Sequence, residues 1–376
     1  MSFRFIHASD LHLGRKFANI PQPPDGNIRG RLMEARHEAL HRLAETARQQ
    51  GAAHVMLAGD TFDTATPSAG LIRQALAAMG EAQDITWWLL PGNHDNLHHA
   101  EPLWEAIRRD APRNVQAVTE PAPIEMAAGA TLLPCPVAFR TGASDPTDPL
   151  PAMPSPEGNL RIGLAHGGVT DFDDTGAAIA PDRDRSARLD YLALGDWHGR
   201  RAVSERVQYP GTPEQDRFKH GRRGLCLAVE LASPGAPPDV TEVEIGKFLW
   251  REVELPLHPG QDPEAALAAA LPAKGRRDLL LRVSASGWAS LPEHAALQQA
   301  ARRIGPEFAH FDLRSDALGT QYDSADLDEI DRAGALRLAA DTLLEEAESK
   351  DLPQEEREIA QAALSRLYAY VKEAGE

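Results

Sequence analysis

The stretch that decides the fold is TWWLLPGNHD, residues 86–95. The run Thr86–Leu90 is apolar and rich in β-favouring residues, so it predicts a buried strand. A turn at Pro91 and Gly92 ends that strand. Three side chains of the kind that bind metals or move protons follow at once: Asn93, His94 and Asp95. In α/β sheets the carboxyl ends of strands form the crevice in which ligands bind. The stretch therefore predicts a strand that carries part of a site at its end.

The same arrangement recurs along the first half of the chain. Four more runs predict strands: Phe3–Ala8, His54–Ala58, Arg161–Ala165 and Tyr191–Leu194. They are followed, in turn, by Asp10-Leu11-His12, Gly59-Asp60, His166-Gly167 and Gly195-Asp196-Trp197-His198. Segments of helical period, Glu34–Gln50 and Ser68–Glu81, lie between the first strands, and the second helix is expected to be capped near Thr66 with Pro67 in its first turn. This alternation indicates an α/β domain in which distant residues converge on one rim.

The side chains at these strand ends share a ligand chemistry. Oxygen donors from Asp and Asn, mixed with imidazole nitrogen, suit Mn²⁺, Fe²⁺ or Zn²⁺. A single carboxylate such as Asp60 can bridge two cations about 3.5–4 Å apart, the spacing used for in-line displacement at phosphorus. Taken alone, Gly59-Asp60 is an ordinary turn, and Asp10 with His12 is a strand-end pair that meets solvent. The ordered set, however, favours a binuclear metal site.

The second half of the chain has a different pattern. It predicts a β-α-β-α-β unit formed by Trp250–Leu255, Pro263–Leu271, Leu279–Ser284, Pro292–Ile304 and Phe308–Arg314. Apolar residues at helical spacing, beginning at Leu336 and again at Ile359, predict two final helices, the second starting near Pro353. These amphipathic stripes either dock a partner or pack on the chain's own domain.

Composition limits the class of protein. The net charge of −17 argues against a broad basic face for gripping duplex DNA. It does not exclude a nucleic-acid substrate, because bound divalent cations add positive charge where a phosphate must sit. Two cysteines are too few for a disulfide framework. No apolar run is long enough to span a membrane, and the N-terminal residues lack the apolar segment of a secretory signal. We therefore expect a cytoplasmic protein with no membrane partner.

The motifs together resemble a known superfamily. Asp10-X-His12, Gly59-Asp60, Gly92–Asp95, His166 and Asp196-X-His198 look like the calcineurin-like binuclear metallophosphoesterases. The segments Ser9–Gly14, Gly59–Asp63 and Tyr209–Thr212 are similar to SbcD-type DNA-repair nucleases. The resemblance implies an α/β fold with three parts. They are a metallophosphoesterase β-sandwich flanked by helices over residues 1–245, a smaller α+β capping domain over 246–318, and a C-terminal helical segment over 319–376.

The resemblance also implies a role for each matching residue. Metal one would take Asp10, His12, Asp60 and His198, and metal two would take Asp60, Asn93, His166 and Asp196. His94 would contact the scissile phosphate, and Asp95 would orient His94. The family pattern has His-X-His where this chain has Asp196-Trp197-His198. An Asp ligand tilts the preference toward Mn²⁺. The alternative is that Asp196 only accepts hydrogen bonds and that metal two is weak.

The expected function is metal-dependent hydrolysis of DNA phosphodiesters, with single strands favoured and a place in DNA repair. Basic residues near the first and last motifs are expected to hold backbone phosphates, or else to form a solvated charged turn: Arg15, Arg200, Arg217, Lys219 and Arg222. Trp197 either stacks a base or packs in the core. Two other functions stay open. One is a small-molecule or cyclic-nucleotide phosphodiesterase. The other is a subunit that mainly docks an SbcC-like ATPase or other DNA-repair proteins.

Overall fold

The computed structural model describes residues 2–23, 26–140, 144–169, 178–321, 330 and 334–375. The chain divides into two compact units, Met1–Leu249 and Trp250–Glu376. Among the described residues, no helix has both the length and the apolar character that a membrane span requires. The first unit carries the predicted site.

The first sheet of this unit has six strands. Their order across the sheet is β12 (Asp239–Glu244), β11 (Leu225–Leu231), β1 (Phe3–Ala8), β2 (His54–Leu57), β3 (Thr86–Leu89) and β4 (Val115–Ala117). Strands β1 to β4 are parallel, whereas β11 pairs antiparallel with both β1 and β12. The three strands predicted here are confirmed, although β2 and β3 each end one residue earlier than expected. Because β1, β2 and β3 are parallel neighbours, the motifs that follow them emerge at one edge.

The second sheet is also six-stranded. Its order is β5 (Ile124–Ala127), β6 (Ala130–Cys135), β7 (Leu160–His166), β8 (Tyr191–Gly195), β10 (Val207–Tyr209) and β9 (Arg201–Ala202). Strands β6, β7, β8 and β10 run parallel. Both strands predicted in this region are confirmed, and β7 extends far enough that His166 is its last residue. The carboxyl ends of β7 and β8 are therefore neighbours as well.

The two sheets pack face to face through alternate side chains. One core cluster contains Phe5, Met56 and Trp88 from the first sheet together with Ile162 and Tyr191 from the second. The residues at intervening positions of β1, β2 and β3 point the other way, into a core shared with helices, because successive strand side chains face opposite sides. The predicted α/β fold is thus confirmed as a sandwich of two mixed sheets with helices on the outside.

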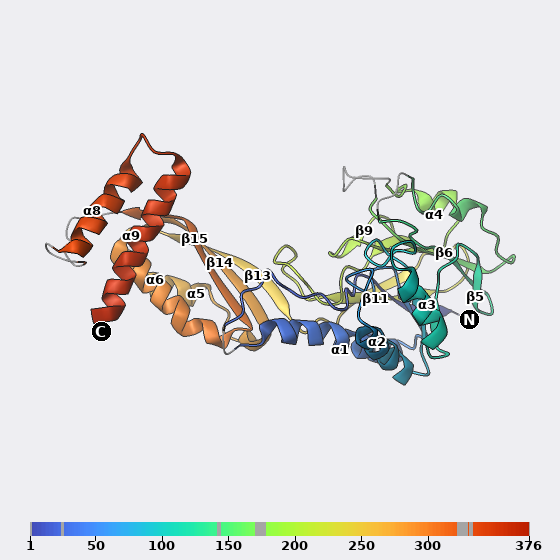
Figure 1. The fold of residues 1–376 in the computed structure, drawn as a ribbon. Helices are drawn as coiled ribbons and strands as arrows, with labels where there is room; N and C mark the ends of the chain where they lie inside the picture. Colours follow the sequence, from blue (N-terminus) through green and yellow to red (C-terminus); the bar gives the residue numbers. More distant parts are fainter. Residues whose placement is uncertain are drawn as a thin grey trace. The chain divides into compact units, whose positions relative to one another are not determined.

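Helices α1 (Ile28–Gln49), α2 (Ala69–Glu81) and α3 (Glu101–Asp110) cover the outer face of the first sheet (Figure 1). The first begins at Ile28 rather than at the predicted Glu34. The prediction for the second cap was wrong, because the side chain of Ser68, and not Thr66, accepts a hydrogen bond from Leu71 N at 3.2 Å. The outer side of the second sheet carries only a short 3-10 turn, η1 (Leu150–Ala152), and the single-turn α4 (Arg183–Ser186) among the residues that the structure describes.

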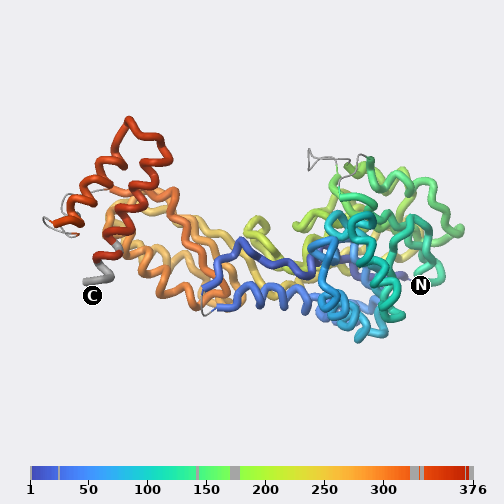
Figure 2. The backbone as a smooth tube through the Cα atoms, viewed as in Figure 1, coloured from blue at the N-terminus to red at the C-terminus, as the bar shows by residue number. Residues whose placement is uncertain are grey.

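The second unit contains the predicted β-α-β-α-β order. It consists of β13 (Leu249–Leu257), α5 (Pro263–Ala270), β14 (Leu279–Ser290), α6 (Leu291–Ile304) and β15 (His310–Gln321), with short 3-10 turns η2 (Arg276–Asp278) and η3 (Gly305–Glu307). Its sheet has the order β13-β14-β15, and β14 and β15 are parallel. A helical hairpin, α8 (Ala335–Glu348) and α9 (Gln354–Gly375), follows in red in Figure 2. The start of α9 confirms the predicted helix start. The domain boundaries at 245 and 318 stay a prediction.

Candidate metal centre

The site residues lie where the strands of both sheets end. Asp10, Asp60 and Asn93 follow β1, β2 and β3 of the first sheet, whereas His166 ends β7 and His198 follows β8 of the second. The two sheets are joined at this rim by the backbone N–H of Asp196, which donates to both carboxylate oxygens of Asp10 at 3.2 Å. The structure therefore brings together, on a shared rim, residues that are far apart in the sequence.

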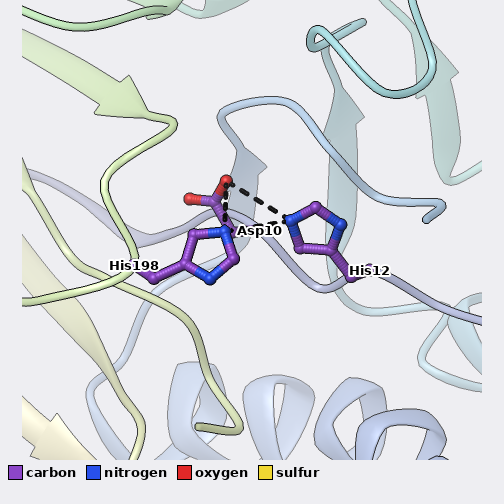
Figure 3. A group of neighbouring side chains, drawn as sticks. All are labelled: Asp10, His12 and His198. Carbon is purple, nitrogen blue, oxygen red and sulfur yellow. Dashed lines mark hydrogen bonds and ion pairs between the residues drawn. The ribbon is translucent and has the colours of Figure 1, made fainter. Parts of the chain in front are cut away.

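One group of donors is formed by Asp10, His12 and His198 (Figure 3). The Nε2 atoms of both histidines lie 3.9 Å from Asp10 Oδ1, and they lie 3.1 Å from each other. One donor atom of each residue falls within 4.8 Å of the other two. Asp10 and His12 are buried, so these donors have little access to bulk water. Three converging donors of this kind fit a divalent cation.

The carboxylate of Asp60 faces two groups of donors. Its Oδ2 lies 3.5 Å from His12 Nε2, and its Oδ1 lies 3.7 Å from His166 Nε2. Asp60 accordingly belongs to a group with His12 and His94 and to a second group with Asp10 and His166. A carboxylate that presents one oxygen to each of two donor groups is the arrangement expected of a bridging ligand.

The second group contains buried polar atoms that lack partners. His166 Nε2 and Asn93 Oδ1 are both buried, and neither has a hydrogen-bond partner among the described residues. The other atom of each side chain is held: His166 Nδ1 donates to Ala58 O at 2.8 Å, and Asn93 Nδ2 donates to Asp196 Oδ1 at 3.1 Å. Buried polar groups are almost always paired in native proteins. A cation bound by His166 Nε2 would satisfy that atom. Asn93 is joined to the same group through Asp196 Oδ1, which lies 3.8 Å from His166 Nε2, so the residues present fit a second metal ion.

Asp196 lies at the edge of this group. Its Oδ1 is 3.8 Å from His166 Nε2, and its side chain is 33% exposed. By accepting the hydrogen bond from Asn93 it turns the amide oxygen of Asn93 away from itself. Its position suits either role considered from the sequence, and its service as a ligand of metal two stays a prediction.

The backbone at the site is strained. Asp10, His12, Asp60 and Asp196 all have positive φ, at 55°, 44°, 54° and 103°. This region is uncommon for residues other than glycine and costs of order 1–3 kcal/mol at each position. Backbone hydrogen bonds hold the strained turns in place, from Asp10 N to Gly59 O at 3.1 Å and from His12 N to Asp60 O at 2.9 Å. The fold thus holds these donors in conformations that they would not adopt on their own.

Burial and mutual charge shift the pKa values of the donors. Burial raises the pKa of Asp60 to about 7, and the neighbouring Asp10 adds to that rise while His166 opposes it. Burial acts to lower the pKa of His166, but the charges of Asp60, Asp10 and Asp196 outweigh it and raise that pKa to about 9. Clustered acids of this kind repel one another unless positive charge lies between them. The electrostatics of the site therefore favour a bound cation.

The hydrogen bonds of His94 and Asp95 differ from the expected ones. His94 Nδ1 lies 2.8 Å from Asp63 O, so the Asp63 carbonyl orients the imidazole. The buried carboxylate of Asp95 instead accepts from Gly92 N at 2.7 Å and from Phe62 N at 3.0 Å. The expectation that Asp95 orients His94 is corrected accordingly. Asp95 joins the turn after β3 to the turn after β2, because its two oxygens accept from one backbone N–H of each.

The five predicted substrate-binding residues separate into two sets. Arg15 and Arg217 lie at the metal centre, where both contact the carboxylate of Asp216 at 3.3 and 2.9 Å. Lys219 Nζ lies 4.8 Å from the centre of the Trp197 ring, beside the turn that carries His198. The other two, Arg200 and Arg222, each bind Glu242 on β12 at 2.8 Å. Both arginines are thus paired with an acid, as Arg15 and Arg217 are, and their contact with a substrate stays a prediction.

Sequence reasoning missed two acidic residues at the centre. Asp63 Oδ1 lies 3.2 Å from His12 Nδ1, and Asp216 Oδ2 lies 2.9 Å from His198 Nδ1. Asp216 is therefore hydrogen-bonded to the Nδ1 atom of one predicted ligand, whereas Asp63 lies within ion-pair distance of the Nδ1 atom of another. Asp63 could have been recognised from the sequence, because it is the last residue of the Gly59–Asp63 segment. Asp216 had a weaker signal, as an acid directly before the basic residues that begin at Arg217.

Comparison with known proteins adds the family context. The model of the calcineurin-like phosphoesterase family matches residues 3–199. A curated relative, the uncharacterized metallophosphoesterase YhaO of Bacillus subtilis (strain 168), is 26% identical over 277 residues, which is 66% of this chain and 66% of that protein, just under two thirds of its length. The crystal structure of TT1561 of Thermus thermophilus aligns at 10% identity with a TM-score of 0.39, covering 64% of this chain and 99% of that one.

Proposed function

Because this chain belongs to the calcineurin-like phosphoesterase family, we propose that it hydrolyses the phosphodiester bonds of DNA, with single strands favoured, using two divalent cations. Membership in the family supports phosphoester hydrolysis with divalent metals. We propose in addition that the substrate is DNA, that single strands are favoured and that the enzyme acts in DNA repair.

The observation that carries the proposal is the Asp60 carboxylate, which presents one oxygen to His12 and the other to His166. One cation would be held by Asp10, His12, Asp60 and His198, and the other by Asp60, Asn93, His166 and Asp196. When bound, such a pair of cations supplies an activated water at neutral pH and neutralises the charge that develops on the phosphate. The mixed oxygen and nitrogen donors favour manganese, with iron or zinc as alternatives.

The chain itself supplies a proton donor at the rim. Because a carbonyl oxygen only accepts, the contact between His94 and Asp63 O requires the proton on Nδ1 of His94. This leaves Nε2 as the atom that takes up or delivers a second proton. We infer that His94 Nε2 donates to the scissile phosphate or to the leaving oxygen, as a general acid. The closeness of His94 to His12 and Asp60 puts it beside the donors that would hold the cations.

Support for a DNA substrate comes from the cationic side chains around the centre. Arg15 is 28% exposed and Arg217 is 48% exposed, so both reach solvent next to buried donors. Lys219, over the Trp197 ring, adds a third positive charge. Backbone phosphates are held by such groups on either side of the bond that is cut. A small-molecule or cyclic-nucleotide phosphodiester is the alternative substrate, since it needs the same metal chemistry and fewer flanking cations.

A second candidate function is favoured by the helical hairpin of the second unit. Leu338 on α8 and Ile359 on α9 are 70% and 63% exposed. Exposed apolar side chains on a helix pair suit contact with the helices of a partner. We propose an SbcC-like ATPase as this partner, with other DNA-repair proteins as alternatives.

Both cysteines are free and buried, which accords with the reducing cytoplasm in which we propose that the enzyme acts.

The test is to incubate the purified chain with end-labelled single-stranded DNA, duplex DNA and a simple phosphodiester, each with Mn²⁺, Mg²⁺, Zn²⁺ or no metal. We expect cleavage of single-stranded DNA to be fastest with Mn²⁺ and absent without metal. An Asp10→Asn preparation, purified in parallel, controls for contaminating nucleases. Cleavage of the simple phosphodiester alone would favour the alternative substrate class. Strong activity of the isolated chain would show that an ATPase partner is not obligatory.

A further inference from the structure

We propose that Asp216 is a positioning residue, which fixes the proton of His198 on Nδ1 and thereby keeps His198 Nε2 free to bind a cation. The inference deepens the proposed function, because it rests on the metal site described above. Asp216 belongs to neither the family motifs nor the set of predicted ligands.

The first support is the setting of the Asp216 carboxylate. Its side chain has no solvent exposure, and its two oxygens are divided between partners. Oδ2 lies 2.9 Å from His198 Nδ1, and Oδ1 accepts from Arg217 Nε at 2.9 Å. Arg15 Nη1 and Arg36 Nη2 lie 3.3 and 3.8 Å from Oδ2. Three guanidinium groups, which have hydrogen-bond donors only, thus surround one buried carboxylate, so the oxygens of Asp216 act as acceptors.

The second support is the way in which Arg36 is held. This buried guanidinium donates from Nη1 to Leu11 O at 2.6 Å and from Nη2 to Glu214 O at 3.0 Å. Leu11 lies between the two predicted ligands Asp10 and His12. Arg36 therefore ties the Asp216 carboxylate to the backbone that carries these ligands. The carboxylate occupies a defined place relative to the metal centre, as a group that orients a ligand must.

The third support is a competition at His198 Nδ1. This nitrogen lies 2.9 Å from Asp216 Oδ2 but also 3.2 Å from Arg217 Nη2, which is a donor. If Nδ1 carries the proton, it donates to Asp216. If Nδ1 accepts from Arg217, the proton of the neutral ring must sit on Nε2. That atom lies 3.1 Å from His12 Nε2, so a proton there would point into the group of donors. Asp216 and Arg217 therefore favour opposite tautomers, and only the one favoured by Asp216 leaves a lone pair for the cation.

The first experiment measures Mn²⁺ affinity by titration calorimetry on the full chain after chelation and dialysis. Asp216→Asn keeps the shape and removes the charge, and we expect one of the two binding steps to weaken by about 10- to 100-fold. Arg217→Ala removes the competing donor, and we expect affinity that is equal to wild type or higher. A carboxylate with a merely structural role would lower thermal stability in both variants and leave Mn²⁺ affinity unchanged, which would overturn the inference.

Asp190→Asn is the matched control. Asp190 is also buried, accepts from Arg161 N at 2.8 Å and from Gly235 N at 2.6 Å, and has an arginine, Arg206, at 3.8 Å, but it contacts none of the predicted ligands. We expect this variant to lose stability while it binds Mn²⁺ like the wild type. An equal loss of affinity in Asp190→Asn and Asp216→Asn would mean that general destabilisation is the cause, and it would overturn the inference.

A second measurement tests the proposed position of the His198 proton even if Asp216→Asn fails to fold. The ring ¹⁵N shifts of His198 in the cation-free wild-type chain, assigned by comparison with His198→Gln, report which nitrogen carries the proton. We expect the Nδ1–H form, and the Nε2–H form would overturn the inference. A wild-type chain that bound no Mn²⁺ would instead refute the proposed function, and the tautomer would still be readable. A wild-type chain and an Asp216→Asn variant that bound Mn²⁺ equally well would refute this inference alone.

Discussion

Replacing Asp60 with asparagine should make the cation-free chain more stable at pH 8 while it abolishes the response to Mn²⁺. The carboxylate is 2% exposed, and its pKa is raised from 3.8 to about 7, mainly by burial. An acid with a raised pKa in the folded state holds its proton longer there than in the unfolded chain. Stability is therefore lost as pH rises from about 4 to about 7, and the folded protein bears the cost of an ionised Asp60 at every higher pH. A neutral asparagine side chain at this position would remove that cost.

The size of the effect follows from the same shift. About three pH units at 1.36 kcal/mol each correspond to about 4 kcal/mol, which is an upper bound because water and neighbouring groups rearrange around the charge. We expect about half of it, ~2 kcal/mol, or a rise of about 4–8 °C in Tm for a unit of this size. His166 limits this gain, because its pKa is raised to about 9 where the charges of Asp60 and its neighbours outweigh burial, and the variant loses the attraction of Asp60 that stabilises protonated His166 below that pH.

The assay is thermal unfolding of chelator-treated wild-type and Asp60→Asn protein at pH 5 and pH 8, with and without Mn²⁺. Wild type should be stabilised by the cation by about 2.7 kcal/mol at one hundred times its Kd, and the variant should not respond. The difference between the two cation-free proteins should shrink at pH 5, where more of Asp60 is protonated. A variant that is less stable than wild type at pH 8, or that keeps the full response to Mn²⁺, would refute the reasoning.

Three other predictions concern single side chains. His94→Ala should lower kcat about 10²- to 10⁴-fold while two Mn²⁺ ions still bind, as measured by turnover and calorimetry; loss of an ion would make His94 a ligand. Asp196→Ala should lose the second Mn²⁺ ion, and a variant that kept both ions and full activity would reduce Asp196 to a hydrogen-bond acceptor for Asn93. Arg217→Ala should reduce the salt dependence of DNA binding by about one in slope, whereas Arg200→Ala should leave it unchanged because the Arg200 side chain is only 12% exposed, against 48% for Arg217; equal slopes for the two variants would contradict this division.

The parts of the fold that could be predicted are those in which local sequence and burial agree. Runs such as Thr86–Leu89 are apolar on both faces because one face meets the second sheet and the other meets the helices. The polar residues that follow each run could then be placed at one edge, because parallel strands end together. The predicted helix starts agreed less well with the structure. Because Arg29 and Arg31 are polar, the sequence did not indicate the first turn of α1. Its buried positions, such as Ile28 and Leu32, become clear only when the sheet beneath the helix is known.

The parts that could not be predicted depend on long-range partners. Whether a basic side chain faces a phosphate or an acid is settled by what lies across from it, and Glu242, the partner of Arg200 and Arg222, is on an antiparallel edge strand with no motif of its own. The same holds for Asp216, whose contacts with His198 and Arg36 join three distant segments. The contacts of Asp95 were missed for a related reason. Its carboxylate oxygens accept hydrogen bonds from backbone N–H groups, and every residue type except proline has such a group.

The site takes donors from both sheets: Asp10, Asp60 and Asn93 stand on the first, and His166 and His198 stand on the second. Beneath them, the buried His7 of the first sheet bonds Tyr191 Oη at 3.0 Å and Leu194 O at 3.1 Å on the second. A folding intermediate in which only one sheet has formed would contain only part of the set of metal donors. Manganese should therefore slow unfolding far more than it speeds refolding, because the interaction exists only after the two layers have docked. Cation binding would then report a late step in folding, the docking of one sheet on the other.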